Sequence, residues 1–290
     1  MQIRKVGVVG CGLMGGGIAQ VCAQSGFETV VREVSQAALD QGLRRIESIL
    51  LKDVGKGKLG AEAKDAALAR IQPTLALDTF ADCQIVIEAI VERLDAKREL
   101  FAALDQICPP ATIFASNTST LSITEIAGAS GRDDRVVGLH FCLPAQLMKL
   151  IEVSPGIATS DETFAKAWGW CEAAGQLPVK TQDKTGFILN ALLIPFNNDC
   201  IRAVEAGVAS AADVDTAIKT AFGYKMGPLE LVDLVGLDTQ VRLCEAFYPI
   251  TLDPRAAAPP LLRRMVAAGW LGRKTGRGFF KYNGNAMFGA

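Results

Sequence analysis

Residues 5–33 read KVGVVGCGLMGGGIAQVCAQSGFETVVRE, and this stretch decides the fold. An apolar strand, residues 5–9, leads into Gly10-Cys11-Gly12-Leu13-Met14-Gly15, which has the spacing G-x-G-x-x-G. An apolar helix follows, and then a second strand, residues 28–32, with the acidic Glu33 directly behind it. This order of strand, glycine turn, helix, strand and acid is typical of a dinucleotide-binding βαβ unit.

Each glycine of the turn has a chemical reason. Gly10 permits the tight turn, Gly12 lets the backbone approach a pyrophosphate, and Gly15 lets the helix pack against the strand. The helix then offers free N–H groups and a positive dipole end to the phosphates. The predicted cofactor-binding loop is therefore Gly10, Gly12, Leu13, Met14 and Gly15. The alternative is a glycine-rich turn without a ligand.

Glu33 favours NAD over NADP. A carboxylate here would accept hydrogen bonds from the adenosine ribose hydroxyls and would repel a 2′-phosphate. Its neighbour Arg32 weakens the distinction, because an arginine could accommodate that phosphate.

Composition narrows the class of protein. Residues 6–27 carry no charge and could pass for a signal peptide or a membrane span, but their glycines make a poor lipid-facing helix. Thirty basic and 31 acidic residues nearly cancel, which gives no support to nucleic acid as a partner. Eight scattered cysteines without a CxxC pair indicate reduced thiols. We expect a cytoplasmic protein with no membrane and no metal site.

The rest of the chain divides into two parts. The first half alternates apolar runs with amphipathic ones, which predicts a parallel sheet with crossover helices, and from residue 186 onward the patterns are helical. We predict an α/β fold: a Rossmann-like NAD-binding domain, residues 1–184, followed by an all-helical domain, residues 185–290. Further strands are expected at residues 84–90, 112–115, 136–139, 150–153 and 177–179. Helices are expected at residues 36–51, 61–71, 95–107, 187–205, 211–221, 228–234, 239–247 and 260–268, with capping spacings at Ser122 and Ser210.

The chain has one histidine, His140, at the end of the predicted strand 136–139. A lone histidine at the end of an apolar strand is more often structural than catalytic. Ligands of open α/β sheets, however, bind beyond the carboxyl ends of the strands, where His140 lies. Glu152 follows in the next extended run and could fix the imidazole tautomer, and Ser119 belongs to the same edge. A base beside a nicotinamide suggests alcohol oxidation.

Several motifs resemble those of a known family, the short-chain L-3-hydroxyacyl-CoA dehydrogenases, and most of all its bacterial 3-hydroxybutyryl-CoA dehydrogenases. They are VGVVGCGLMGGGIAQV, IEAIVERLDAK, FASNTSTLSIT, GLHF with MKLIEV, GFILN, GYKMGPLELVDLVGLD and GRKTGRGFF. The resemblance covers nearly the whole chain. It implies a role in fatty acid metabolism and a homodimer that pairs through the helical domain.

The resemblance also implies residue roles. His140 matches the catalytic base and Glu152 its carboxylate partner, while Ser119 and Asn190 match residues that contact the substrate's C3 oxygen. Further matches are, for the cofactor, Glu92, Lys97, Ser119 and Lys274, and, for the coenzyme A phosphates, Lys56.

Each of these residues also has a structural interpretation. Ser119 could cap a turn, Asn190 could be an ordinary helix amide, and Lys274 could be a turn residue. Glu92 and Lys97 could form a solvated charged face, and Lys56 a solvated helix end.

The chain departs from the family pattern at two places that bear on the acyl group. Leu143 in HFCLP stands where the family has asparagine, and Ala191 stands where it has arginine. The expected reaction is NAD-dependent oxidation of a short-chain L-3-hydroxyacyl-CoA to the 3-oxoacyl-CoA. One alternative is a dehydrogenase of another 3-hydroxy acid or of a dicarboxylic acyl-CoA. The other is a weakly catalytic NAD-binding structural protein.

Overall fold

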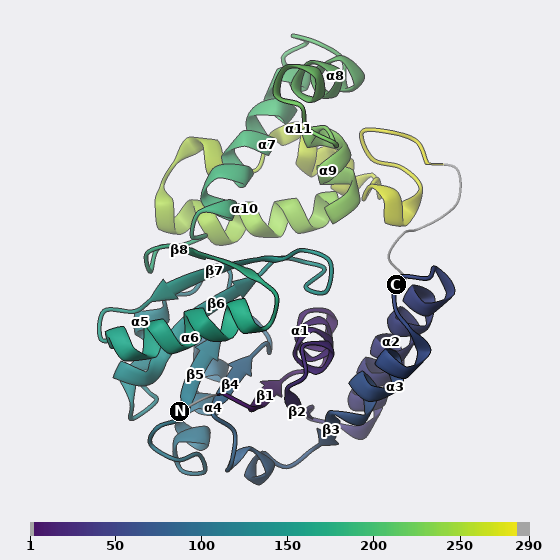
Figure 1. Ribbon diagram of the computed structural model, residues 1–290. Coiled ribbons are helices and arrows are strands. Elements are labelled where there is room, and N and C mark those ends of the chain that lie inside the picture. The colour runs from purple at the N-terminus through teal and green to yellow at the C-terminus, as the bar shows by residue number, and fades with distance from the viewer. Residues whose placement is uncertain (1–2, 283–290) are drawn as a thin grey trace. The chain divides into compact units, whose positions relative to one another are not determined.

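The chain forms two units, which divide between Phe187 and Ile188 (Figure 1). They are seen in a computed structural model that describes residues 3–282. None of the helices in the described residues is both long and apolar enough to span a bilayer.

The first unit is built on one eight-stranded sheet. The strand order is β3-β2-β1-β4-β5-β6-β7-β8. The strands are β1 (Lys5–Val9), β2 (Glu28–Arg32), β3 (Ile71–Thr74), β4 (Ile85–Glu88), β5 (Ile113–Ser116), β6 (Val136–Phe141), β7 (Leu150–Pro155) and β8 (Leu177–Lys180).

The strands β1 to β6 are parallel, so their carboxyl ends lie along one edge of the sheet. The β7 strand reverses direction against β6, which corrects the expectation of a purely parallel sheet. The connection of residues 142–149 explains the reversal, because a parallel return needs a crossover of about a dozen residues or more. The β8 strand then runs parallel to β7.

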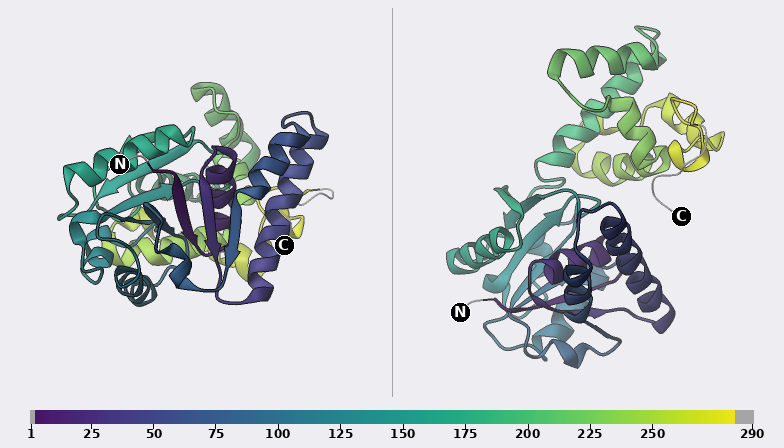
Figure 2. Two further views of the ribbon diagram at one scale, coloured as in Figure 1. Left: turned by 60° about the horizontal axis from the view of Figure 1, so that its bottom comes forward. Right: turned by 45° about the vertical axis from the view of Figure 1, so that its right-hand side comes forward.

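Helices cover both faces of the sheet (Figure 2). One apolar core packs under α1, α2, α3 and α6, and the other under α4 and α5. The helices are α1 (Leu13–Gln24), α2 (Gln36–Gly55), α3 (Ala61–Ala69), α4 (Leu94–Asp105), α5 (Ile123–Ala127) and α6 (Asp161–Ala173). Two short 3₁₀ helices lie in the connections, η1 (Leu77–Phe80) before β4 and η2 (Asp133–Arg135) before β6.

The second unit is helical, with its own apolar clusters. Isolated β-bridges from Arg277 to Gly272 and to Lys281 are the exception to an all-helical chain there. Its helices are α7 (Leu189–Glu205), α8 (Ala211–Phe222), α9 (Pro228–Val235), α10 (Leu237–Thr251) and α11 (Pro260–Ala267), with 3₁₀ helices η3 (Pro254–Ala256) and η4 (Arg273–Thr275).

The expected fold class is confirmed, with shifts at element ends. The capping serines Ser122 and Ser210 both accept the predicted backbone N–H. The helix expected from Phe187 begins at Leu189, because Phe187 has a left-handed backbone, with φ of 52°. Two elements go beyond the expected set, α6 and the edge strand β3. Pro73 obscures β3 in the sequence, although proline is tolerated at a sheet edge.

Candidate active site

His140 and Glu152 form a buried pair across two strands. They are direct partners in the antiparallel register of β6 and β7, and His140 lies inside β6 instead of just beyond it. The imidazole Nδ1 is 2.7 Å from the Glu152 Oε2. Because an ionised carboxylate only accepts hydrogen bonds, this contact with an ionised Glu152 requires the proton on Nδ1, and a neutral imidazole then has its lone pair on Nε2. The His140 side chain keeps a small exposed fraction, while that of Glu152 has none.

The chain after β5 is tied to the strand that carries His140. The Asn117 side-chain oxygen accepts a hydrogen bond of 2.9 Å from the backbone N–H of Phe141, the residue next to His140. The backbone N–H of Asn117 donates to the Glu88 carbonyl at the end of β4. The turn of residues 117–120 is therefore fixed to the carboxyl ends of both neighbouring strands.

Glu92 gathers this turn around one carboxylate oxygen. Its Oε1 accepts hydrogen bonds from the Thr118 hydroxyl at 2.6 Å, the Ser119 N–H at 2.9 Å and the Thr120 N–H at 3.1 Å. The Ser119 hydroxyl lies 3.4 Å from the same atom, and Ser119 is half-buried. Burial raises the pKa of the Glu92 carboxyl, but the Lys97 charge and the hydrogen bonds from the turn outweigh it and lower the pKa below its usual value.

Lys97 is not part of a solvated face, which corrects the structural interpretation given to it above. Its side chain is 1% exposed, and its ammonium contacts Glu88 at 2.6 Å and Glu92 at 3.1 Å. The ammonium therefore holds two carboxylates together inside the protein. Its contact with a cofactor stays a prediction.

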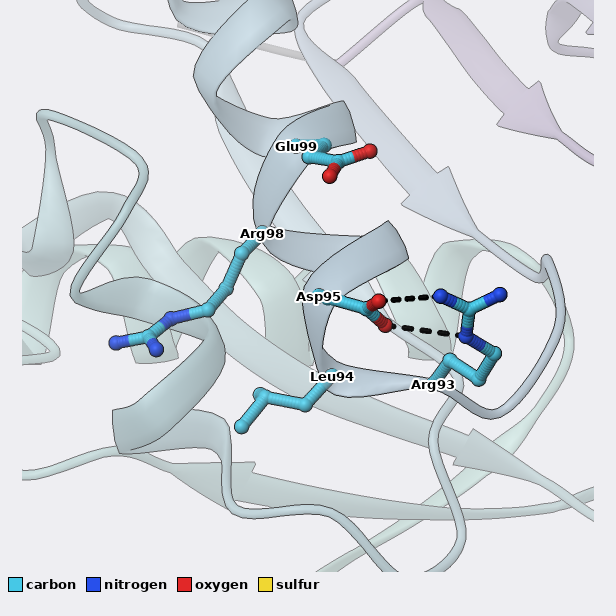
Figure 3. A pocket seen from close by; sticks show the side chains of 5 residues that line it. All are labelled: Arg93, Leu94, Asp95, Arg98 and Glu99. Carbon is cyan, nitrogen blue, oxygen red and sulfur yellow. Dashed lines mark hydrogen bonds and ion pairs between the residues drawn. The ribbon is translucent and has the colours of Figure 1, made fainter.

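The outer side of the same helix start is a separate feature. Figure 3 shows a pocket there, in which Arg93 pairs with Asp95 while Arg98 extends away from that pair. The pocket is lined by Arg93, Leu94, Asp95, Arg98 and Glu99. None of these residues belongs to the His140 pair or to the 117–120 turn.

The glycine loop has the geometry that a dinucleotide requires. A Cβ on Gly15 would lie 1.9 Å from the Gly10 carbonyl oxygen, so the helix can approach the turn only with glycine here. Gly10 has a φ of +99°. A Cβ on Gly12 would meet nothing within 4 Å, which leaves open space over the backbone. Leu13 and Met14 form the first turn of α1, whose terminal N–H groups have no intrahelical partner.

Glu33 lies against this loop. Its carboxylate accepts hydrogen bonds from the Cys11 N–H at 2.7 Å and the Val34 N–H at 3.0 Å. Arg32 donates its Nε to the Leu75 carbonyl at 3.2 Å, so that side chain is held at the end of β3. Open space over Gly12 beside a fixed carboxylate fits a dinucleotide with free ribose hydroxyls.

The remaining predicted residues lie apart from this group. Lys56 is exposed at the end of α2, and no carboxylate within residues 3–282 forms an ion pair with it. Asn190 lies in the first turn of α7, half-buried, in the second unit. Lys274 lies in η4 of the second unit and pairs with Asp238. The first unit therefore brings together His140, Glu152, Glu92, Lys97 and the 117–120 turn at the carboxyl edge of the sheet, along which the glycine loop also lies.

Comparison with protein families shows to which family the chain belongs. The model of the 3-hydroxyacyl-CoA dehydrogenase NAD binding domain matches residues 5–184, and that of the 3-hydroxyacyl-CoA dehydrogenase C-terminal domain matches residues 186–282. The chain belongs to the 3-hydroxyacyl-CoA dehydrogenase family. It is thus an NAD-dependent oxidoreductase, as the glycine loop and Glu33 predict.

Family members resemble the chain over nearly its full length. A probable 3-hydroxybutyryl-CoA dehydrogenase of Deinococcus radiodurans is 46% identical, over 96% of this chain and 100% of that protein. The human mitochondrial hydroxyacyl-coenzyme A dehydrogenase is 42% identical, over 97% of this chain and 91% of that protein. The crystal structure of (S)-3-hydroxybutyryl-CoA dehydrogenase from Ralstonia eutropha has a TM-score of 0.91 at 39% identity, covering 98% of this chain and 100% of that one.

Two residues of the site, Glu88 and Asn117, are absent from the sequence predictions. Glu88 carried a readable signal, since it is the one charged residue in the apolar run of β4. Asn117 carried none, because its use depends on how far β6 extends.

Proposed function

We propose that the chain oxidises the hydroxyl of a short-chain L-3-hydroxyacyl-CoA, such as 3-hydroxybutyryl-CoA, to the 3-oxoacyl-CoA, with His140 as the general base. The observation that carries the proposal is the His140–Glu152 contact of 2.7 Å at the edge of the sheet that also holds the glycine loop. The relatives from Deinococcus radiodurans and Ralstonia eutropha are named as 3-hydroxybutyryl-CoA dehydrogenases, which supports a short acyl group for the substrate.

The chemistry follows from the orientation of the imidazole. The free Nε2 of His140 accepts the hydroxyl proton of the substrate, and Glu152 stabilises the imidazolium that results. When bound, NAD accepts the hydride that leaves the C3 carbon. Ser119 and Asn190 hold the C3 oxygen in place. Glu33, with the N–H groups after Gly12, holds the dinucleotide.

Coenzyme A requires a cationic contact, for which we propose Lys56. Its ammonium is exposed and free of carboxylate partners within the described chain, as phosphate binding requires. The pathway that we propose is fatty acid metabolism.

We further propose a homodimer that pairs through the second unit. Large apolar side chains are exposed there, and burial in an interface would remove them from water. Those more than 60% exposed are Leu192, Val208, Phe222 and Leu252. We propose the cytoplasm as the location, because all eight cysteines are free.

A related reaction on another 3-hydroxy compound is the second candidate. Leu143 is 58% exposed in the connection between β6 and β7, and its apolar side chain cannot donate a hydrogen bond to a substrate. Leu143 would therefore affect which acyl group is accepted, and it leaves the His140–Glu152 pair unchanged.

The test is oxidation of NADH in the presence of acetoacetyl-CoA, followed at the nicotinamide absorbance band. NADPH and free acetoacetate are the controls. We expect rapid oxidation only with NADH and the CoA ester. Bound NADH without turnover would reject this substrate, and a series of other 3-hydroxy and 3-oxo compounds would then identify the acyl group.

A further inference from the structure

Lys97 occupies the buried side of α4. This side also carries Leu100, Phe101 and Leu104, so the lysine lies in an apolar stripe. An unpaired ammonium in such a place is strongly destabilising, so Lys97 depends on its carboxylate partners and keeps one of them if the other is neutralised. These partners are Glu88 at 2.6 Å and Glu92 at 3.1 Å.

Glu88 is fully buried at the end of β4, and its two oxygens connect three elements. The Oε1 atom accepts hydrogen bonds from Lys97 of α4 and, at 2.8 Å, from the Ile90 N–H. The Oε2 atom accepts a hydrogen bond of 2.6 Å from the Ser116 hydroxyl at the end of β5. Glu88 thus joins the ends of two strands to the helix that follows the first of them.

Glu88 and Lys97 hold the turn that carries Ser119 from two sides. On one side the Ser116 hydroxyl, already bound to Glu88, accepts the Thr118 N–H at 3.2 Å. On the other side Lys97 contacts the Oε2 atom of Glu92, whose Oε1 atom accepts from Thr118, Ser119 and Thr120. Without the ammonium, the carboxylates of Glu88 and Glu92 would repel each other, and Glu92 is the more exposed of the two.

We propose that Glu88 and Lys97 are positioning residues of the dehydrogenase site, which act through Glu92 and Ser116 to hold the 117–120 turn and hence Ser119 in place. The Glu88 side chain is 0% exposed and that of Lys97 is 1% exposed. The cofactor contact predicted for Lys97 is a separate role, and it does not enter a measurement made on the cofactor-free protein. The consequence for catalysis rests on the function proposed above for Ser119. The hydrogen bonds and ion pairs that fix the turn do not depend on that function. The structural effect and the catalytic effect can therefore be tested separately.

The decisive variant is Glu88→Gln with Lys97→Met in the full chain. Removing both charges leaves no unpaired buried charge, which keeps the variant folded. Hydrogen–deuterium exchange of the cofactor-free protein should become about tenfold faster or more over residues 117–120, while β1 and β2 keep their rates. Lys5→Met with Asp82→Asn removes an ion pair between β1 and the connection before β4, and it should change no rate in the turn.

Kinetics give the second readout. In the double variant the KM for acetoacetyl-CoA should rise by about tenfold, whereas kcat should fall less and its pH profile should be unchanged, because the His140 pair is intact. The KM for NADH is no readout of positioning, since Lys97 is also a predicted cofactor contact. Unchanged exchange over 117–120 in the folded double variant would overturn the proposal. If that variant does not fold, Glu88→Gln alone decides: faster exchange supports the proposal and an unchanged rate overturns it.

The two failures are distinguishable. A wild-type protein that is inactive on acetoacetyl-CoA, with the exchange effect present, would reject the proposed substrate and retain the positioning role. An active wild type whose double variant is unchanged in both exchange and KM would retain the function and reject the positioning role.

Discussion

His140 can act as a base only through the nitrogen that Glu152 leaves free. The carboxylate is fully buried, so the hydrogen bond at Nδ1 is protected from water. Phe187 lies beside the imidazole, with 5.6 Å between the ring centroids, and restricts its rotation. The fold itself therefore orients the imidazole ring, and no ligand is needed to do so.

We expect His140→Gln to lower kcat by about 10²- to 10⁴-fold, the usual contribution of general acid–base catalysis. Glutamine can keep a polar contact with Glu152 but cannot accept the proton. NADH binding, measured by fluorescence titration, should remain within a few-fold of wild type. Turnover close to the wild-type rate would remove His140 from the mechanism.

At the scale of single residues the sequence was a partial guide. Position at a strand end pointed to His140 and Ser119, because the carboxyl edge of a parallel sheet is where ligands bind. The same argument was wrong for Glu152, because β7 is antiparallel to β6 and brings its beginning, not its end, to this edge. Lys97 was harder to interpret, since a lysine five residues after a glutamate fits a solvated helix face equally well. Its spacing to Leu100, Phe101 and Leu104 was the available signal for burial.

Among the elements, the turn between β1 and α1 uses two glycines for different reasons. At Gly15 the position that a Cβ would take is already filled by the Gly10 carbonyl. At Gly12 the corresponding position is open. A substitution at the first position therefore disturbs the protein itself, and one at the second disturbs the approach of a ligand.

We expect Gly12→Val to leave the melting temperature within a few degrees of wild type while NADH affinity falls by about tenfold or more, because the side chain fills the space that a pyrophosphate needs. We expect the matched Gly15→Val to lower the stability by roughly 2 kcal/mol or more, since the clash is with backbone. Thermal denaturation and NADH titration of both proteins provide the test. A stable Gly15→Val protein that binds NADH normally would contradict this account of the loop.

Element types could be predicted where the local sequence signals were strong. The predictions were weak where pairing with another strand decides the structure. The serine caps of α5 and α8 are local chemistry and were predicted from spacing alone. The direction of β7 follows from the length of the connection before it, and β3 exists because β2 offers it an edge. The pairing of β3 with β2 depends on a neighbour far along the chain, which single-sequence periodicity does not report.

At the scale of the whole molecule, the first unit has its own two cores on either side of the sheet. We expect residues 1–187 expressed alone to unfold cooperatively and to bind NADH. We expect no turnover from this fragment, because it lacks Asn190, for which we proposed a contact with the substrate. Calorimetry, NADH titration and the acetoacetyl-CoA assay measure the three properties. Full activity of the fragment would rule out a role for the second unit in the reaction.

Buried thiols give the molecule a dependence on alkaline pH. Burial raises the pKa of Cys108 and of Cys142 from 9.0 to about 11. A raised pKa means that the folded state holds the proton more tightly, so the stabilisation is complete below pH 9 and is lost as pH rises toward 11. We expect the melting temperature to fall over this window, and Cys108→Ala to reduce the fall. An equal fall in the alanine variant would show that other groups cause it.

The cross-strand pairing of His140 with Glu152 leaves residues 142–149 outside the reacting pair. Strand register holds the two residues together, so the hairpin loop between them can accept new side chains without separating base from carboxylate. We therefore expect a substitution at Leu143 to change the acyl group that is preferred and to leave the His140–Glu152 contact in place. If His140 is the base, as proposed, the preferred acyl group and the proton transfer are specified by separate parts of the chain, the loop and the strand register.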